Sequence, residues 1–172
     1  LAAFPAVGVL AAAPVDRVLE LWSGLGYYRR AHHLHAAAEV IAAQYGGRFS
    51  SDARTIATLP GVGRSTAAAI AVFAFGARAA ILDRNVKRVL ARHRGIDGFP
   101  GAPKVEARLW EIAESLLPER GVETYTQALM DLGATLCTRT APRCGECPVA
   151  TDCVARFEGR IADLPAPRPA RA

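Results

Sequence analysis

Four cysteines constrain this chain more than any other feature of its sequence. They are all the cysteines in its 172 residues, and they lie close together at Cys137, Cys144, Cys147 and Cys153, in the spacing C-x6-C-x2-C-x5-C. A chain of this length buries enough apolar surface to fold without disulfides, and nothing in the sequence indicates secretion, where disulfides are common. The cluster of thiols therefore favours a bound metal centre.

The spacing also bears on which metal centre the thiols would hold. Structural zinc sites usually pair two short C-x2–4-C segments, and this chain has only one, at Cys144 and Cys147. Four thiolates on unequal loops suit the wider corners of a [4Fe-4S] cluster better than one small ion. We therefore expect a [4Fe-4S] cluster, with zinc, disulfides or free thiols as the alternatives.

The remaining sequence predicts an all-α chain. Apolar residues recur at helical spacing, and no run alternates with the period of a strand. Predicted helices cover 16–22, 29–45, a short segment from Ser51 or Asp52 to about Leu59, a segment from Ser65 or Thr66 to Phe75, and then 85–94, 103–116 and 123–136. From Leu164 onward the chain is rich in proline, which predicts an unpacked tail or linker. No stretch reaches the roughly 20 apolar residues of a membrane helix, so we expect no membrane partner.

Leu59-Pro60-Gly61-Val62-Gly63-Arg64 predicts a tight turn that ends at the start of a helix. Its glycines allow positive φ and a close approach of the backbone to a ligand, and the helix start offers unpaired N–H groups to an anion. The net charge of +5 is compatible with a polyanionic partner but is weak support by itself. The turn therefore predicts contact with DNA phosphates through residues 59, 61, 62, 63 and 64, and a simple helix-helix connection is the alternative.

The cysteine spacing and the segment 59–67 together resemble the helix-hairpin-helix DNA glycosylases of the endonuclease III and MutY type, over about residues 1–160. This resemblance implies a [4Fe-4S] cofactor and a fold with two helical lobes. Residues 1–79 would form part of a six-helix barrel with the hairpin, 80–160 would form the cluster lobe, and 161–172 would be a tail or linker. The target base would enter between the lobes.

The segment Ile81-Leu82-Asp83-Arg84-Asn85 resembles the part of the family that carries the catalytic aspartate. Cleavage of an N-glycosidic bond builds positive charge on the sugar, and a carboxylate at Asp83 would stabilise that charge. Asn85 would orient the aspartate or the substrate. An ordinary helix N-cap is the alternative for Asp83. Arg84 departs from the small residue expected at its position.

Four more basic residues are predicted to contact DNA phosphates, and a solvated surface is the alternative. They are Lys87 and Arg88, after the aspartate, and Arg139 and Arg143, between the first two cysteines.

Three positions favour the MutY type within the family. Tyr27, in Leu21–Arg30, resembles the tyrosine that wedges into the base stack, although a core aromatic is the alternative. Ser65 stands where endonuclease III has the lysine that forms a Schiff base, so we expect base removal without strand cleavage. Gln127 matches a residue that faces the adenine pocket, with a passive helix position as the alternative.

The resemblance thus implies a monofunctional enzyme that removes adenine mispaired with 8-oxoguanine or guanine. Its partner would be double-stranded DNA, and the protein would be a monomer located in the bacterial cytoplasm at the nucleoid. The family's N-terminal glutamate, which protonates adenine, and its C-terminal 8-oxoguanine domain have no counterpart in residues 1–172, so we expect this fragment to be impaired in catalysis. An endonuclease III-like glycosylase-lyase for oxidised pyrimidines and a non-catalytic DNA-binding iron-sulfur protein remain the alternatives.

Overall fold

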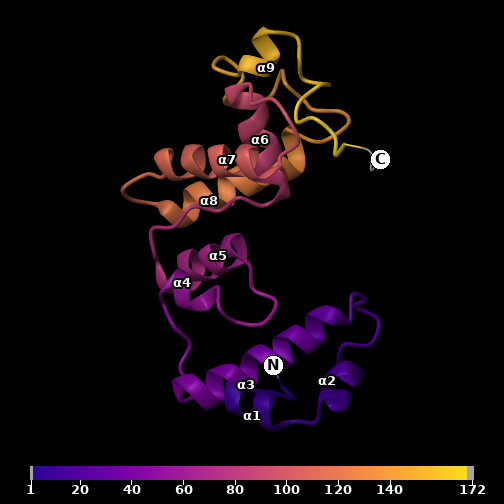
Figure 1. The fold of residues 1–172 in the computed structure, drawn as a ribbon, viewed down its shortest axis with the longest axis vertical. Coiled ribbons are helices and arrows are strands. Elements are labelled where there is room, and N and C mark those ends of the chain that lie inside the picture. The colour runs from indigo at the N-terminus through magenta and orange to yellow at the C-terminus, as the bar shows by residue number, and fades with distance from the viewer. Residues whose placement is uncertain (1, 170–172) are drawn as a thin grey trace. The chain divides into compact units, whose positions relative to one another are not determined.

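A computed structural model of the chain describes residues 2–169, and these residues form helices, turns and loops without a strand (Figure 1). The all-α prediction is therefore confirmed. In chain order the helices are α1 (Val7–Ala12), α2 (Val15–Leu21), α3 (Arg29–Tyr45), α4 (Ala53–Ile56), α5 (Arg64–Phe75), α6 (Arg84–Arg94), α7 (Pro103–Ser115), α8 (Val122–Asp131), the π-helical η1 (Leu132–Leu136) and α9 (Val154–Phe157). Residue 1 of the predicted barrel lobe and residues 170–172 of the predicted tail lie outside the described residues.

The chain divides within α5 into two compact units, Leu1–Ala71 and Val72–Ala172. The predicted lobe boundary at 79/80 falls inside the second unit. No helix in residues 2–169 has the length and apolarity that crossing a membrane requires.

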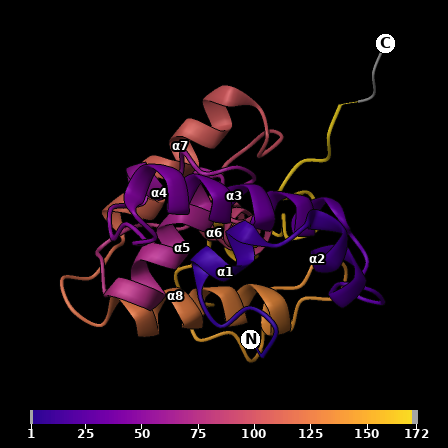
Figure 2. The same cartoon turned by 90° about the horizontal axis from the view of Figure 1, so that it is seen from below.

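The first unit is built on α3, against which α1 and α2 both pack (Figure 2). Ala31, His35, Ala38 and Ile41 recur every three or four residues along α3 and are buried, so one face of the helix supplies the core. The helix ends at Gly46, which takes the left-handed conformation that glycine adopts without strain. The predicted helix over 29–45 is therefore confirmed with both of its ends.

The second unit is organised around α6, which packs against α7, α8, η1 and α9. Asp83 caps the start of α6, and Gly95 ends the helix in the left-handed conformation. Along the buried side of α6, Val86, Val89 and Leu90 supply apolar contacts, but Arg88 and Arg92 are buried there as well. Buried guanidinium groups require polar partners, and these partners lie in the cysteine region.

Three features of the fold differ from the expectations. The predicted helix 123–136 divides into α8 and a single π-helical segment, η1, which leads directly into Cys137. The short helices α1 and α9 carry too little apolar periodicity to be predicted. The expectation that the chain is unpacked from Leu164 onward is wrong at that residue, because Leu164 is only 2% exposed and its carbonyl accepts a hydrogen bond from Arg92.

Candidate functional site

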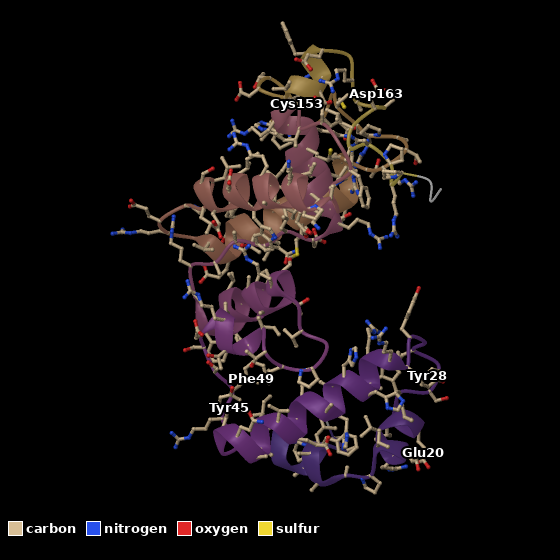
Figure 3. All side chains as sticks on the ribbon, viewed as in Figure 1. Glu20, Tyr28, Tyr45, Phe49, Cys153 and Asp163 are labelled. Carbon is tan, nitrogen blue, oxygen red and sulfur yellow. The ribbon has the colours of Figure 1, made fainter. Side chains whose placement is uncertain are left out.

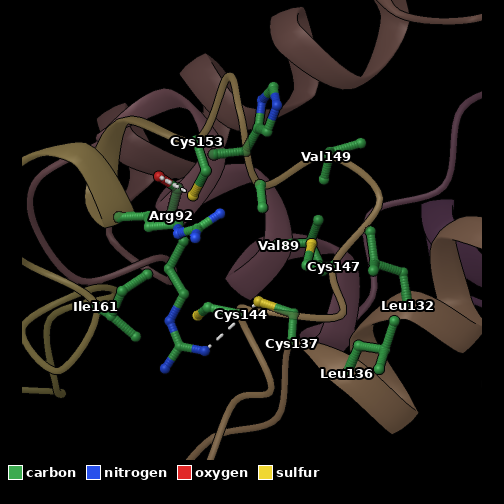
Figure 4. Close-up of a pocket in the computed structure, with 13 residues that line it drawn as sticks. Val89, Arg92, Leu132, Leu136, Cys137, Cys144, Cys147, Val149, Cys153 and Ile161 are labelled. Carbon is green, nitrogen blue, oxygen red and sulfur yellow. Dashed lines mark hydrogen bonds between the residues drawn. The ribbon is translucent and has the colours of Figure 1, made fainter.

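The four cysteines line one cavity in the second unit (Figure 4). Cys137 follows η1, Cys144 and Cys147 lie on the next loop, and Cys153 is the N-cap of α9. None of the four forms a disulfide. The rest of the cavity wall is largely apolar and includes Val89, Leu132, Leu136, Val149 and Ile161. In the described part of the chain, no group of three His, Cys, Asp or Glu side chains is arranged to hold a single metal ion.

Arg92 holds the first cysteine in place from α6. Its Nη1 donates to Cys137 Sγ at 3.5 Å and to the Thr138 carbonyl at 2.7 Å. Its Nη2 donates to the Arg139 carbonyl at 3.1 Å, and its Nε donates to the Leu164 carbonyl at 2.7 Å. One buried guanidinium therefore joins the cysteine loop to the segment that follows α9.

Arg88 lies one turn earlier on the same face of α6. Its Nε donates to the Cys137 carbonyl at 2.7 Å, and its Nη2 donates to the Gly133 carbonyl at 2.6 Å and to Asn85 Oδ1 at 2.9 Å. The structure thus corrects the expectation of a surface phosphate contact at Arg88, because this side chain is 8% exposed and its guanidinium is directed into the protein. Burial lowers the pKa of Arg88, and the nearby charges of Arg92 and Arg139 act in the same direction.

The network of Arg88 reaches the residues next to the predicted catalytic aspartate. Asn85 Oδ1 accepts from Arg88, and an added Cβ on Gly133 would lie only 2.7 Å from the Cβ of Asn85. Gly133 therefore allows η1 to pack tightly against the start of α6. This contact links the segment before Cys137 to the segment that holds Asp83.

Asp83 is partly exposed and occupies the N-cap position of α6. Its Oδ1 accepts a hydrogen bond from the Val86 amide at 2.8 Å. The N-cap alternative is thus correct as a description of the local structure, and it fixes the direction of the carboxylate. A cap bond does not prevent the carboxylate from stabilising a cation, since the bond from the Val86 amide uses only Oδ1.

The other predicted phosphate contacts lie at the surface of the second unit or near it. Lys87 Nζ is 2.6 Å from Glu106 Oε1, and both side chains are partly exposed. Arg139 is exposed. Arg143 is exposed as well and pairs with Glu146 at 2.9 Å.

The predicted hairpin turn has the expected backbone. Gly61 has a φ of +74°, and a Cβ at this position would collide with the ring of His33. Leu59 is buried at 6% exposure, and its carbonyl accepts from the Val62 amide at 3.1 Å. The Gly63 carbonyl accepts from the Ala67 amide at 2.9 Å, which brings the backbone into α5. Arg64 and Ser65 form the first turn of α5.

Tyr27 projects from the loop before α3, with 84% of its surface exposed and a φ of +48° that is unusual for a residue other than glycine. A core position is therefore excluded for this aromatic. Its neighbour Tyr28, labelled in Figure 3, is also exposed at 47%. Arg30 lies over the rings of Tyr27 and Trp22, and the Trp22 Nε1 donates to the Gly26 carbonyl at 2.9 Å.

Gln127 is exposed on α8, and its Nε2 donates to Asp131 Oδ1 at 2.8 Å, one turn along the helix. The structure thus gives it a surface position within its own unit.

The sequence did not predict that Arg92 donates hydrogen bonds to distant carbonyls, or that His33 lies against the turn at Gly61. A signal for the arginines is present, because Arg88 and Arg92 repeat at i, i+4 in phase with the buried Val89. The contact of the partly exposed His33 carries no comparable pattern, since α3 holds two other histidines, His32 and His35.

Comparison with known families shows to which family the chain belongs. Residues 1–115 match the model of the HhH-GPD superfamily of base excision DNA repair proteins. The chain belongs to this superfamily. The family part of the resemblance drawn from the cysteines and the hairpin is therefore confirmed.

Adenine DNA glycosylases of other organisms are similar to most of the chain. The adenine DNA glycosylase of Buchnera aphidicola (subsp. Acyrthosiphon pisum) is 41% identical over 94% of this chain and 46% of its own length. The adenine DNA glycosylase of Mycolicibacterium smegmatis is 43% identical over 86% of this chain and 50% of its own length. The chain thus spans about half the length of these relatives. Among solved structures, a thermostable thymine-DNA glycosylase has a TM-score of 0.82 and 30% identity, covering 91% of this chain and 72% of its own.

Proposed function

We propose that the protein is a monofunctional adenine DNA glycosylase, which hydrolyses the N-glycosidic bond of adenine mispaired with 8-oxoguanine or guanine. The observation that carries this proposal is the 41–43% identity with adenine DNA glycosylases over most of the chain. Ser65 supports the monofunctional assignment, because a hydroxyl cannot form the imine that a lyase requires. The proposed partner is double-stranded DNA, bound by a monomer at the bacterial nucleoid.

In the proposed reaction, Asp83 stabilises the positive charge that develops on the deoxyribose as the base departs. The N-cap bond from the Val86 amide holds the carboxylate in one orientation before the substrate arrives. Asn85 is held in turn by Arg88, so the start of α6 is rigid. A preorganised charge costs no reorganisation at the moment of reaction.

The proposed roles of the remaining site residues follow from their resemblance to positions in the family. The amides of the 59–64 turn contact DNA phosphates, Tyr27 enters the base stack from its exposed loop, and Gln127 contributes to recognition of adenine. Lys87, Arg139 and Arg143 add phosphate contacts. Residues 1–79 and 80–160 are the two proposed lobes, and 161–172 is the proposed linker.

We further propose that Cys137, Cys144, Cys147 and Cys153 hold a [4Fe-4S] cluster. The residues fit the group, because four thiols line one cavity and thiolates are the ligands that such clusters use. No three of the described side chains surround the position of a single ion. The cluster would supply a rigid crosslink between η1, the cysteine loop and α9. A structural role suffices, since hydrolysis of a glycosidic bond transfers no electron. Iron and acid-labile sulfide in equal amounts would support this assignment, and zinc without sulfide would contradict it.

A single-turnover assay tests the proposed function. The whole protein is mixed in excess with a duplex that contains adenine opposite 8-oxoguanine, and abasic sites are counted after alkaline cleavage. We expect adenine release, and we expect Asp83→Asn to slow it by about 100-fold or more, which is typical for loss of one electrostatic stabiliser. Release of oxidised pyrimidines in preference to adenine, or an unchanged rate in Asp83→Asn, would contradict the proposal.

A further inference from the structure

A second concave surface in the Val72–Ala172 unit adjoins the cysteine cavity at Arg92, which lines both. Its walls come from residues 84–92 of α6, the turn at 99–101, the loop after Cys137 and the segment 162–168. Six basic side chains line it, namely Arg84, Lys87, Arg88, Arg92, Arg139 and Arg168. We refer to this surface as the basic groove.

The charge of the basic groove is poorly balanced. No Asp or Glu side chain lines it within the part of the chain that the structure describes. Its two buried cations, Arg88 and Arg92, donate mainly to backbone carbonyls, which carry no net charge, and Arg92 also donates to Cys137 Sγ. Lys87 has a carboxylate partner in Glu106, but that pair is partly exposed to solvent. Charges buried beneath a groove are screened less by salt than surface charges. The electric field in the basic groove therefore favours an anion.

The segment 162–168 is held firmly enough to form a wall. Leu164 is buried, and its carbonyl accepts from the buried Arg92. Two prolines follow, Pro165 and Pro167, and each restricts its own φ. The exposed Arg168 is therefore displayed from a short, stiff segment, and a phosphate contact there would cost less conformational entropy than a contact from a free tail.

We propose that the basic groove binds the phosphodiester backbone of duplex DNA, with Arg84 and Arg168 as contacts that neither the hairpin nor the cysteine loop supplies. This inference rests on the proposed function for the identity of the partner. It assigns the proline-rich segment a binding function beyond that of a linker. Several cations along one groove fit a chain of phosphates better than a single small anion.

Salt-dependent binding of an undamaged duplex tests this inference without base excision. Fluorescence anisotropy gives Kd for the chain, for Arg168→Ala and for Arg84→Ala over a series of salt concentrations. We expect each variant to bind several-fold more weakly at low salt, and the slope of log K against log salt to fall by about 1 for each lost phosphate contact. Arg168→Glu should weaken binding further.

Arg120→Ala is the matched control, because Arg120 is an exposed arginine of the same unit outside the groove. It should leave the salt slope unchanged. Since Arg84 and Arg168 are both exposed, circular dichroism should show the same helix content in every variant. Binding by the unaltered chain with an unchanged slope in Arg168→Ala and Arg84→Ala would overturn the groove alone. Absence of any DNA binding by the unaltered chain would overturn the proposed function as well.

Discussion

The buried guanidinium of Arg92 donates a hydrogen bond to the sulfur of Cys137 at 3.5 Å. The same group donates to the carbonyl of Thr138, within the cysteine segment, and to that of Leu164, after it. A hydrogen bond to a thiolate stabilises its negative charge, and the carbonyls solvate the buried cation. Arg92 therefore ties the geometry of the proposed cluster to the packing of the segment that walls the basic groove.

Arg92→Met should strongly destabilise the second unit. Methionine fills part of the volume but leaves the carbonyls of Thr138, Arg139 and Leu164 without their donor, and each buried unsatisfied carbonyl costs roughly 1–3 kcal/mol. We expect a loss of about 3 kcal/mol or more in the free energy of unfolding, measured by urea denaturation. Iron content should fall as well. Arg108→Met is the control, since Arg108 forms only an exposed pair with Glu111, worth at most about 1 kcal/mol. Equal losses in both variants would contradict this account.

Replacement of Asp83 by asparagine or by alanine should separate its two roles, as the N-cap of α6 and as the proposed catalytic carboxylate. Asparagine caps helices about as well as aspartate, whereas alanine costs about 1 kcal/mol. Urea denaturation should therefore find Asp83→Asn close to the unaltered chain in stability and Asp83→Ala weaker. Base release by the whole protein should be slowed by about 100-fold or more in both. If Asp83→Asn keeps its activity while Asp83→Ala loses it, the residue acts through the helix cap and the charge is not used.

The fold was largely readable from the sequence, and the reasons are local. Helix α3 follows from its apolar spacing and from Gly46, and α6 follows from Asp83 and the apolar positions after it. The gathering of the four cysteines follows from their spacing. Each of these signals lies within a short stretch of chain, where periodicity and capping act.

The features that were missed depend on contacts between distant segments. Arg88 reads as a surface cation by sequence, but it bonds to Cys137 and Gly133, more than forty positions away. Leu164 reads as part of an unpacked tail, but Arg92 captures its carbonyl. Residue type predicts that a buried arginine needs acceptors, yet it does not say which carbonyls supply them.

Gly61→Ala should destabilise the first unit through two separable effects. A φ of +74° is strained for alanine, at a cost of about 1–3 kcal/mol, and its Cβ would collide with His33. We expect a lower urea midpoint, and adding His33→Ala should restore only part of it, because this change removes the imidazole atoms Nδ1 and Cγ but keeps the His33 Cβ at 2.5 Å. Gly63→Ala is the matched control in the same turn, because its φ is ordinary and a Cβ there meets open space. If Gly63→Ala proved equally destabilising, the local conformation of the turn would not be the cause.

Ser65→Lys should introduce the covalent chemistry that the proposed monofunctional mechanism does not use. Residue 65 lies on the first turn of α5, directly after the hairpin, where a lysine amine would attack the sugar to form an imine. Reduction with borohydride should then trap a protein-DNA adduct on a denaturing gel, whereas the unaltered protein should give almost none. Ser65→Arg is the control, since it adds a positive charge without a nucleophilic amine. An adduct in high yield from the unaltered protein would favour the lyase alternative, and its absence from an active Ser65→Lys variant would mean that residue 65 does not face the deoxyribose.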